Sequence, residues 1–200
     1  MKILGDLGSI KDGKVAVVRD SGEFYDVYEN DVKILSVRKN LNILEILADL
    51  GFDYAVFTHQ KPDVEEYETL KSLIRKVKSA EGVERCGAIA IFVGFVRRIS
   101  DGKEVVRLEF ERFDELYEIK LDEIKRRITD MEGVVSVEIY HKVGVLKPGE
   151  DILYVVVMGK HRRNVFKALE ECVELIKKDL PIWKKEVYED GAIWVHDKPQ

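Results

Sequence analysis

Cysteine is scarce in this sequence, with only Cys86 and Cys172 among 200 residues. Their separation does not match the short spacings of metal-binding cysteines, so no metal site is expected from them. Cys172 lies in an apolar helical stripe, and Cys86 directly precedes an apolar strand. We therefore expect both thiols to be reduced core residues that are chemically inert.

Several other features are missing. The first residues lack a signal-peptide pattern, and no apolar run is long enough to cross a membrane, which predicts a cytoplasmic protein with no membrane partner. No Gly-x-x-x-x-Gly-Lys-Ser/Thr loop occurs, so a nucleotide-phosphate cradle of that kind is excluded. The formal net charge of −5 gives no reason to expect nucleic-acid binding. Basic clusters must therefore act locally.

The composition is otherwise that of a folded chain, with 46% hydrophobic and 36% charged residues. A chain of this length can bury a sizeable core, as one domain or as two small ones. Asparagine and glutamine are few, and with the high charge content this is typical of a heat-adapted source. No internal repeat or low-complexity tract is visible.

Residues 1–60 are predicted to form a small α/β unit. Short strands are expected at residues 15–18, 24–28, 32–37 and 52–57, and a helix at residues 40–50. One run of residues could be mistaken for a metal or phosphate loop: Asp6, Gly8, Asp12 and Gly13. Ordinary turn chemistry explains it better, and His59 is likewise interpreted as a loop residue rather than a ligand. Assistance to a partner and dimerisation both remain open as roles for this unit.

Residues 61–200 are predicted to form an α+β domain, a mixed β-sheet sandwich with helices packed on it. The strand from Gly87 to Val96 is apolar almost throughout, which predicts a central strand covered on both faces. Turns are expected at Asp101-Gly102 and at residues 147–149. The remaining elements are a helix with a stripe at Tyr67, Leu70, Ile74 and Val77, a strand at 106–111, a helix at 117–128, and strands at 134–140 and 152–158.

A cationic cluster, His161-Arg162-Arg163, follows the last of these strands. The helix after it is buried on one face, with apolar residues at helical spacing: Val165, Leu169, Cys172 and Ile176. Asn164 is expected to cap this helix, because its side-chain oxygen can accept a free amide of the first turn. His161 and Arg162 then lie just before a helix N-terminus, where unpaired amides and the helix dipole favour an anion.

Two lysines mark the far end of this helix. At about 100° per residue, Lys177 falls on the edge of the buried stripe and Lys178 on the charged side. Pro181 cannot continue the helix, so the chain must turn there. If the chain doubles back, Lys184 meets Lys177, and two close cations attract anions. The plainer alternative is that basic residues here only offset the helix dipole and that the His-Arg pair is a surface loop.

These residues resemble, block by block, the large catalytic subunit of molybdopterin synthase. The resemblance covers about residues 62–198 and holds its spacing throughout, which makes it more specific than any single motif. The C-terminal block comprises His161-Arg162 with Phe166 and Ala168, Lys177, residues 181–186 and residues 191–194. Upstream, residues 87–97 resemble the family's first strand with its glycine and arginine, and residues 141–144 with 148–150 match a third block.

The resemblance implies a sulfur-transfer reaction. A small ubiquitin-like partner would carry a thiocarboxylate on its C-terminal Gly-Gly and donate sulfur to cyclic pyranopterin monophosphate. Two transfers would form the dithiolene of molybdopterin, for a molybdenum or tungsten cofactor. The pocket must hold two anions and needs no metal, cofactor or nucleophilic cysteine, because the sulfur arrives on the partner. The family's large subunits pair, which implies a homodimer within a heterotetramer.

Matched residue by residue, the resemblance implies that Lys177 and Lys184 are catalytic. Either would polarise the partner's terminal carbonyl or stabilise the charge that develops there, and Lys184 would alternatively hold the pterin. The residues implied in substrate binding are Phe95, Val96, Arg97, His161, Arg162, Lys185, Glu186 and Lys198.

Five of these have a more definite implied role. Arg97, His161 and Arg162 would hold the phosphate, and Lys198 would reach the pocket of a neighbouring subunit. Glu186 would orient a lysine or form an ordinary strand ion pair. Lys142 stands where the family has arginine, so bidentate recognition of an anion is lost at that position.

Two other classes of protein remain open. A non-catalytic binding module would use the same cations to capture a phosphorylated metabolite or a peptide carboxylate, and would tolerate Lys→Arg at 177 and 184. An adaptor would use residues 1–60 to recruit a molybdenum- or tungsten-cofactor enzyme, and would do so without affecting synthase activity.

Overall fold

The structure is a computed structural model that describes residues 1–8, 10, 12–62 and 66–195. The chain divides into two compact units, and the boundary falls between Leu73 and Ile74, inside helix α2 (Leu70–Lys78). The sequence-based division at residue 60 lies upstream of this point, because Tyr67 still packs on the core of the first unit. The predicted α+β class is confirmed.

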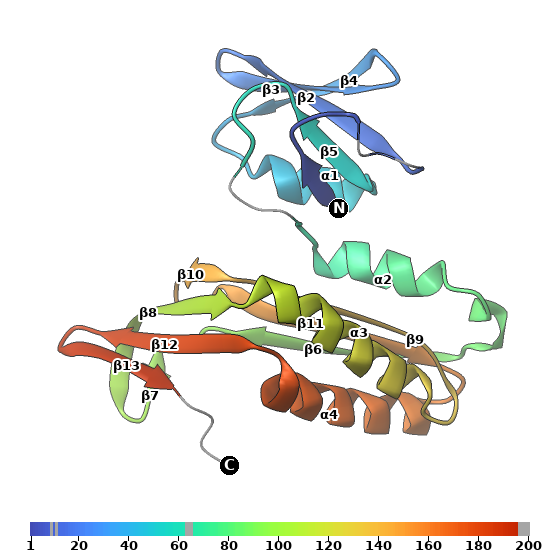
Figure 1. Cartoon of the computed structure of the whole chain (residues 1–200), viewed down its shortest axis with the longest axis vertical. Coiled ribbons are helices and arrows are strands. Elements are labelled where there is room, and N and C mark those ends of the chain that lie inside the picture. Colours follow the sequence, from blue (N-terminus) through green and yellow to red (C-terminus); the bar gives the residue numbers. More distant parts are fainter. Residues whose placement is uncertain (9, 11, 63–65, 196–200) are drawn as a thin grey trace. The chain divides into compact units, whose positions relative to one another are not determined.

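The first unit is a mixed five-stranded sheet in the order β1-β5-β2-β3-β4, with helix α1 (Ile43–Leu50) (Figure 1). Its strands are β1 (Lys2–Leu4), β2 (Val15–Ser21), β3 (Phe24–Glu29), β4 (Val32–Arg38) and β5 (Tyr54–Phe57). β1 and β2 pair in parallel with β5, whereas the other pairings are antiparallel. Three residues are too few to show a pattern, so β1 was not predicted.

Helix α1 begins later than the sequence predicts, at Ile43 instead of residue 40. The reason is Asn42, whose side-chain oxygen accepts hydrogen bonds from the amides of Leu44 (3.1 Å) and Glu45 (3.3 Å). An N-cap residue has extended backbone geometry, so the helix cannot start before it.

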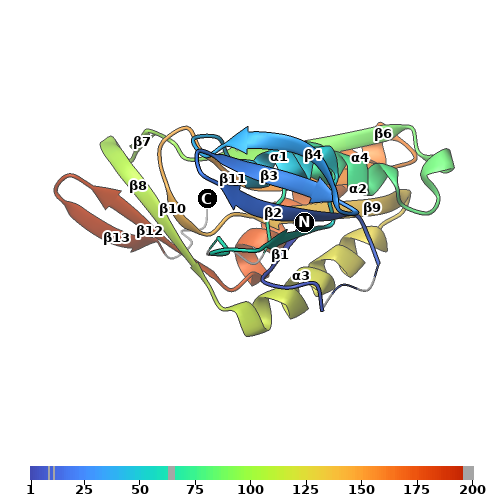
Figure 2. The same ribbon diagram turned by 90° about the horizontal axis from the view of Figure 1, so that it is seen from above.

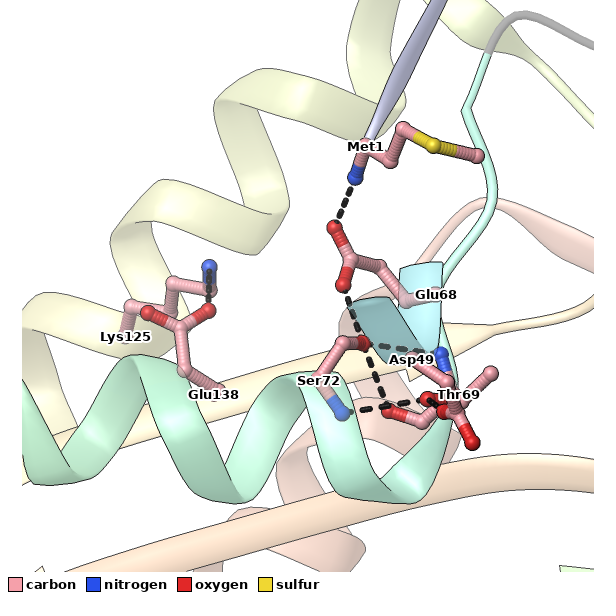
Figure 3. Close-up of polar contacts among 7 residues, drawn as sticks. All are labelled: Met1, Asp49, Glu68, Thr69, Ser72, Lys125 and Glu138. Atoms are coloured by element: carbon pink, nitrogen blue, oxygen red, sulfur yellow. Dashed lines mark hydrogen bonds and ion pairs between the residues drawn. The ribbon is translucent and has the colours of Figure 1, made fainter. Parts of the chain in front are cut away.

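Figure 3 shows the polar contacts that join the start of β1 to the start of α2 within the first unit. The amino group of Met1 donates to Glu68, and the Ser72 hydroxyl donates to the other oxygen of Glu68 at 2.5 Å. Thr69 and Ser72 exchange side-chain and backbone hydrogen bonds, which is the capping-box arrangement. α2 therefore starts at Leu70, and the prediction that Tyr67 belongs to its stripe is wrong.

The second unit contains two sheets and two long helices (Figure 1). One sheet has the order β10-β8-β12-β13, with β7 paired to β8, and the other has the order β6-β11-β9. The bounds are β6 (Ala88–Phe95), β7 (Ile99–Ser100), β8 (Lys103–Arg112), β9 (Val134–His141), β10 (Gly144–Leu146), β11 (Asp151–Gly159), β12 (Ile182–Tyr188), β13 (Gly191–Val195), α3 (Asp114–Thr129), α4 (Arg162–Asp179) and a 3-10 helix, η1 (Val83–Arg85). The described pairings in this unit are antiparallel, so the mixed sheet belongs to the first unit.

The prediction that residues 87–96 form a central strand is wrong. β6 is an edge strand, and β11 takes the central place with nearly every side chain buried. Ile91 and Phe95 of β6 are exposed. An apolar run indicates burial on two faces in many sheets, but it does not reveal which strand has two neighbours.

The main core of the second unit lies between the β6-β11-β9 sheet and helices α3 and α4. The predicted stripe of α4 is confirmed, since Val165, Cys172 and Ile176 are buried in this core and Leu169 packs against it. A smaller core joins Val96, at the end of β6, to the inner face of β8 and β12. Figure 2 shows β8, β12 and β13 gathered at one end of the unit. The described helices include none that is both long and apolar enough to cross a membrane.

His141, the last residue of β9, provides a test of this core. Its ring is buried, its Nδ1–H donates to the carbonyl of Lys142 at 2.7 Å, and it packs edge-on against Phe110. Burial lowers the pKa of His141 from 6.5 to about 4, against the opposing effect of the Lys142 carbonyl. Between these two pH values the unfolded chain binds a proton that the folded chain does not, so stability must rise with pH.

Because of His141, we expect the free energy of unfolding to fall by at most about 3 kcal/mol as the pH drops from 6.5 to 4. Chemical denaturation across that pH range measures the slope. His141→Asn should remove most of it, whereas His161→Asn, at an exposed histidine, should leave it unchanged. An unchanged slope in His141→Asn would show that this ring titrates normally.

Candidate functional site

Lys184 and Glu186 form the shortest ion pair described among the predicted site residues. The Lys184 ammonium lies 2.5 Å from Glu186 Oε1, and the Glu186 side chain is 7% exposed. The hydroxyl of Tyr188 donates to the other carboxylate oxygen, Oε2. The three side chains share one face of β12 because strand residues two apart point the same way. The predicted pairing of Lys184 and Glu186 on one face is therefore present, and it is not a surface ion pair.

Burial alone would raise the pKa of Glu186. The hydrogen bonds from Lys184 and Tyr188 oppose it and leave the pKa below its usual value. The same contact with Glu186, together with burial, raises the pKa of Tyr188. The carboxylate is thus held as an anion, and its oxygens are both occupied.

The pair faces the end of β6. Lys184 lies opposite Phe110 of β8, and Glu186 lies opposite Leu108. Phe110 and Leu108 pack in one cluster with Val96, which directly follows β6. Lys184, Glu186 and the residues that follow β6 therefore lie at the same end of the unit.

A shallow cleft of about 680 Å³ opens at this end. Phe95 and Val96, two of the predicted binding residues, contribute to its walls beside Pro148 and Gly149. Phe95 is 59% exposed, so its side chain is open to a ligand in the cleft. Arg97 is exposed directly after Val96, and its neighbour Arg98 pairs with Glu104 at 3.1 Å.

Lys185 lies on the opposite face of β12 from Lys184. Its ammonium donates to Glu109 at 3.0 Å and lies 5.7 Å from the ring centre of Trp194. The hydrogen bond from Lys185, followed by that from Arg107, lowers the pKa of Glu109. Within one chain Lys185 therefore points away from the Lys184–Glu186 pair.

Lys177 lies in the last turn of α4 and is 49% exposed, with Glu174 at 3.6 Å as its ionic partner. Lys178 is exposed as well, and so is Phe166, which the helical spacing puts beside Lys177. The edge of the stripe thus faces outward at both positions. Exposure alone does not distinguish the two lysines.

The chain bends at Pro181, as predicted, but it does not double back along α4. Leu180 already has extended geometry, with φ −73° and ψ 131°, and β12 begins two residues later. Figures 1 and 2 both show β12 leading away from the end of the helix. Pairing with β8 draws the segment in that direction. The predicted meeting of Lys177 and Lys184 is therefore not produced by a reversal of the chain.

His161 and Arg162 lie at the other end of the unit. β11 runs antiparallel to β6, so Gly159 pairs with Ala88 and Asp151 with Phe95. From Arg162 to Lys177 the helix rises about 22 Å at 1.5 Å per residue. Within one chain, the two proposed phosphate ligands are therefore far from the two lysines.

The local structure at the start of α4 also differs from the prediction. The N-cap residue is His161, not Asn164, and its side chain makes no capping hydrogen bond. Asn164 instead donates from Nδ2 to the carbonyl of Glu132 at 2.8 Å. His161 and Arg162 are both exposed at this helix N-terminus, where they remain available to an anion.

Lys198 lies outside the described residues. Within residues 1–8, 10, 12–62 and 66–195, no group of His, Cys, Asp and Glu side chains could hold a metal ion. Both cysteines are free thiols: burial raises the pKa of Cys172 to about 12, and Cys86 is only partly buried. Neither thiol has the lowered pKa of a nucleophile.

The second unit is thus an α+β domain with exposed cationic side chains at both ends of α4. A family model described as the MoaE protein matches residues 58–179. The chain therefore belongs to the MoaE family.

Individual relatives agree. A molybdopterin synthase catalytic subunit of Bacillus subtilis is 38% identical over 128 residues, which cover 64% of this chain and 79% of the relative. A probable molybdopterin synthase of Haloferax volcanii is 38% identical over 136 residues, or 67% of this chain, but the match spans only 52% of that relative.

Solved structures give the same result. Molybdopterin synthase from Staphylococcus aureus matches with a TM-score of 0.58 and 30% identity, over 67% of this chain and 94% of that one. A complex of subunits 1 and 2 of the molybdopterin-converting factor from Helicobacter pylori matches with a TM-score of 0.52 and 25% identity, over 64% of this chain and 84% of that one.

Two site features were not found by sequence reasoning. Tyr188 completes the hydrogen bonding of Glu186, and the buried hydroxyl of Ser100, two residues beyond Arg98, helps to lower the pKa of the same carboxyl. The alternation of Lys184, Glu186 and Tyr188 along a strand was a usable signal for the first. No local pattern joins Ser100 to β12, because their contact is formed only by the sheet.

Proposed function

We propose that this chain transfers sulfur from the thiocarboxylate of a small partner protein to cyclic pyranopterin monophosphate, as a molybdopterin synthase catalytic subunit. The observation that carries the proposal is the Lys184 ammonium, held 2.5 Å from a buried carboxylate at the end of the unit where the cleft opens. The match to the MoaE family over residues 58–179 supports the same reading.

Lys184 would act through its charge. An ammonium bound to a carboxylate is poorly suited to be a nucleophile, but it can stabilise the negative charge that develops on the partner's terminal carbonyl oxygen. As the sulfur moves to the pterin, water supplies the oxygen that leaves the partner with a carboxylate. Lys177 would contribute a second positive charge, with Phe95, Val96 and Arg97 forming the nearby wall.

The partner would be a small ubiquitin-like subunit ending in Gly-Gly. The matched complex from Helicobacter pylori contains two different subunits of the molybdopterin-converting factor, which supports a heteromeric assembly here. We place catalysis in the second unit, because every candidate residue lies there, and leave residues 1–60 outside it. We also place the reaction in the cytoplasm.

The complete site would be shared by two copies of the chain. His161 and Arg162 lie about 22 Å along α4 from Lys177, which is too far for one small ligand to contact both ends. Pairing of two large subunits can bring the α4 N-terminus of one copy to the Lys184 end of the other. This accounts for phosphate ligands and catalytic lysines that lie apart in the single chain.

The purified protein is expected to form dithiolene only with a thiocarboxylated partner. Mixing it with the precursor and free sulfide should give at most a trace of product, because no cysteine is placed to carry sulfur and the cations recognise a partner's terminus. Product formation is followed by fluorescence of the oxidised pterin. The matched control is the same partner with an ordinary C-terminal carboxylate. Efficient conversion with sulfide alone would contradict the proposal.

A further inference from the structure

The Glu186 carboxylate lies at the centre of a small network that no catalytic role yet explains. One oxygen accepts the Lys184 ammonium, and the other accepts the Tyr188 hydroxyl. Ser100 of β7, the short strand that follows Arg97 and Arg98, is buried as well, and its hydroxyl makes the smallest contribution to the lowered pKa of Glu186.

The network is buried except at the lysine. Glu186 is 5% exposed, Ser100 8% and Tyr188 9%, whereas the Lys184 side chain is 31% exposed. A buried carboxylate is costly unless it is paired and hydrogen-bonded, so each hydroxyl stabilises the charged form. Of these four side chains, that of Lys184 is the most exposed.

Other charged groups lie beside the hydroxyls, not beside the carboxylate. The Lys103 ammonium lies 5.7 Å from the centre of the Tyr188 ring and is itself paired with Asp190 at 2.7 Å. Asp101 adds to the raised pKa of Tyr188. From the neighbouring strands, Leu108 of β8 and Ile193 of β13 lie opposite Glu186, and both are apolar. Lys184 is therefore the ionic partner of Glu186 on the strands packed against it.

We propose that Tyr188, with a smaller contribution from Ser100, is a positioning residue that holds the Glu186 carboxylate and thereby fixes the place of the Lys184 ammonium. The effect on catalysis rests on the proposed sulfur transfer, whereas the effect on the Glu186 carboxylate does not. Lys184 then acts through the position that its contact with Glu186 gives it.

A purely structural role makes a different prediction. If Tyr188 only fills space, Tyr188→Phe keeps the ring and changes neither the charge state of Glu186 nor the pH dependence of the reaction. If the hydroxyl holds the carboxylate, its hydrogen bond opposes the effect of burial, which raises the pKa of Glu186. Loss of the hydroxyl must therefore raise that pKa. The ion pair then breaks at a higher pH than in the original protein.

The test compares Tyr188→Phe and Ser100→Ala with the original full chain by two measurements. Sulfur transfer with the thiocarboxylated partner is expected to show kcat lowered about tenfold in Tyr188→Phe, since a hydrogen bond to a charged group is lost, with KM nearly unchanged. The acid limb of kcat should move to higher pH. Carbon-13 NMR of the glutamate carboxyls, assigned with Glu186→Gln, should show Glu186 titrating at higher pH in the free protein.

Tyr154→Phe is the matched control. Tyr154 is 7% exposed and donates to Asp151 at 2.7 Å, so it too is a buried tyrosine bonded to a carboxylate in the same unit. This variant should leave the kcat profile and the Glu186 titration unchanged. If Tyr188→Phe does not fold, Ser100→Ala is expected to show the same shifts to a smaller extent.

The two measurements separate this inference from the proposed function. A raised Glu186 titration in a protein that transfers no sulfur supports the network and overturns the function. An unmoved titration in an active enzyme overturns the network alone. A raised titration with an unchanged kcat profile also overturns the inference, because the positioning would then have no consequence for Lys184.

Discussion

Lys177→Ala is expected to lower the kcat of sulfur transfer by about 10²–10³-fold or more, the loss typical of removing one group that stabilises a developing oxyanion. Lys178→Ala should stay within about twofold of the original protein, because that side chain lies on the charged side of α4. Both lysines are exposed in the last turn of the same helix. Comparison of the two variants therefore distinguishes a role of Lys177 in the site from a general effect of positive charge at the end of the helix.

The folded state should survive both substitutions, since Lys177 contributes only a weak contact to Glu174 at 3.6 Å with both side chains largely exposed. Thermal unfolding and circular dichroism of the two variants check this. Equal loss of activity in both would show that the assignment of the two lysines around the helix is wrong. Full activity in Lys177→Arg would show that Lys177 contributes only its positive charge.

Mixing Lys184→Ala chains with Arg162→Ala chains is expected to restore activity that neither variant has alone. If each site takes Lys184 from one copy and Arg162 from the other, a mixed dimer has one intact site and one doubly defective site. With random pairing, half of the dimers are mixed, so activity should recover to about a quarter of the original level, as twofold symmetry requires. The two variants are co-expressed with different affinity tags. Dimers that carry both tags are separated from those that carry one, and the sulfur-transfer activity of each kind of dimer is measured.

The control is a mixture of Lys184→Ala and Lys177→Ala chains. These two residues lie at the same end of the unit, so a mixed dimer has no intact site and should gain nothing. Recovery in the control as well would show that Lys177 and Lys184 of one site come from different copies, which contradicts this arrangement. If the mixture of Lys184→Ala and Arg162→Ala chains recovers no activity, either the complete site lies within a single chain or Arg162 does not belong to it.

The local structure of this chain was largely predictable. The stripe of Val165, Cys172 and Ile176 indicated α4, and Pro181 indicated its end, because these signals depend on neighbours within a few residues. The turn at Asp101-Gly102 was predictable for the same reason, since both residues have positive φ. Asn42 as a cap and Thr69 with Ser72 as a capping pair were present in the sequence but were not recognised.

Contacts between distant segments were not predictable. That β6 is an edge strand follows from its single neighbour, β11, which the apolar run in residues 88–95 does not reveal. The direction of β12 follows from its register with β8, where Lys184 lies opposite Phe110. A two-residue period places Lys184 and Glu186 on one face, but only the partner strand decides which face is buried.

The sequence by itself determined the class of fold, the family and the cations that belong to the blocks resembling that family, because these depend on residue order and local periodicity. Only the tertiary structure decided which cations lie together. It put Lys184 with Glu186, Tyr188 and the end of β6, and it put His161 and Arg162 at the opposite end of α4. The physical reason is that strand pairing and the length of a packed helix join residues across the chain, and no local pattern encodes either.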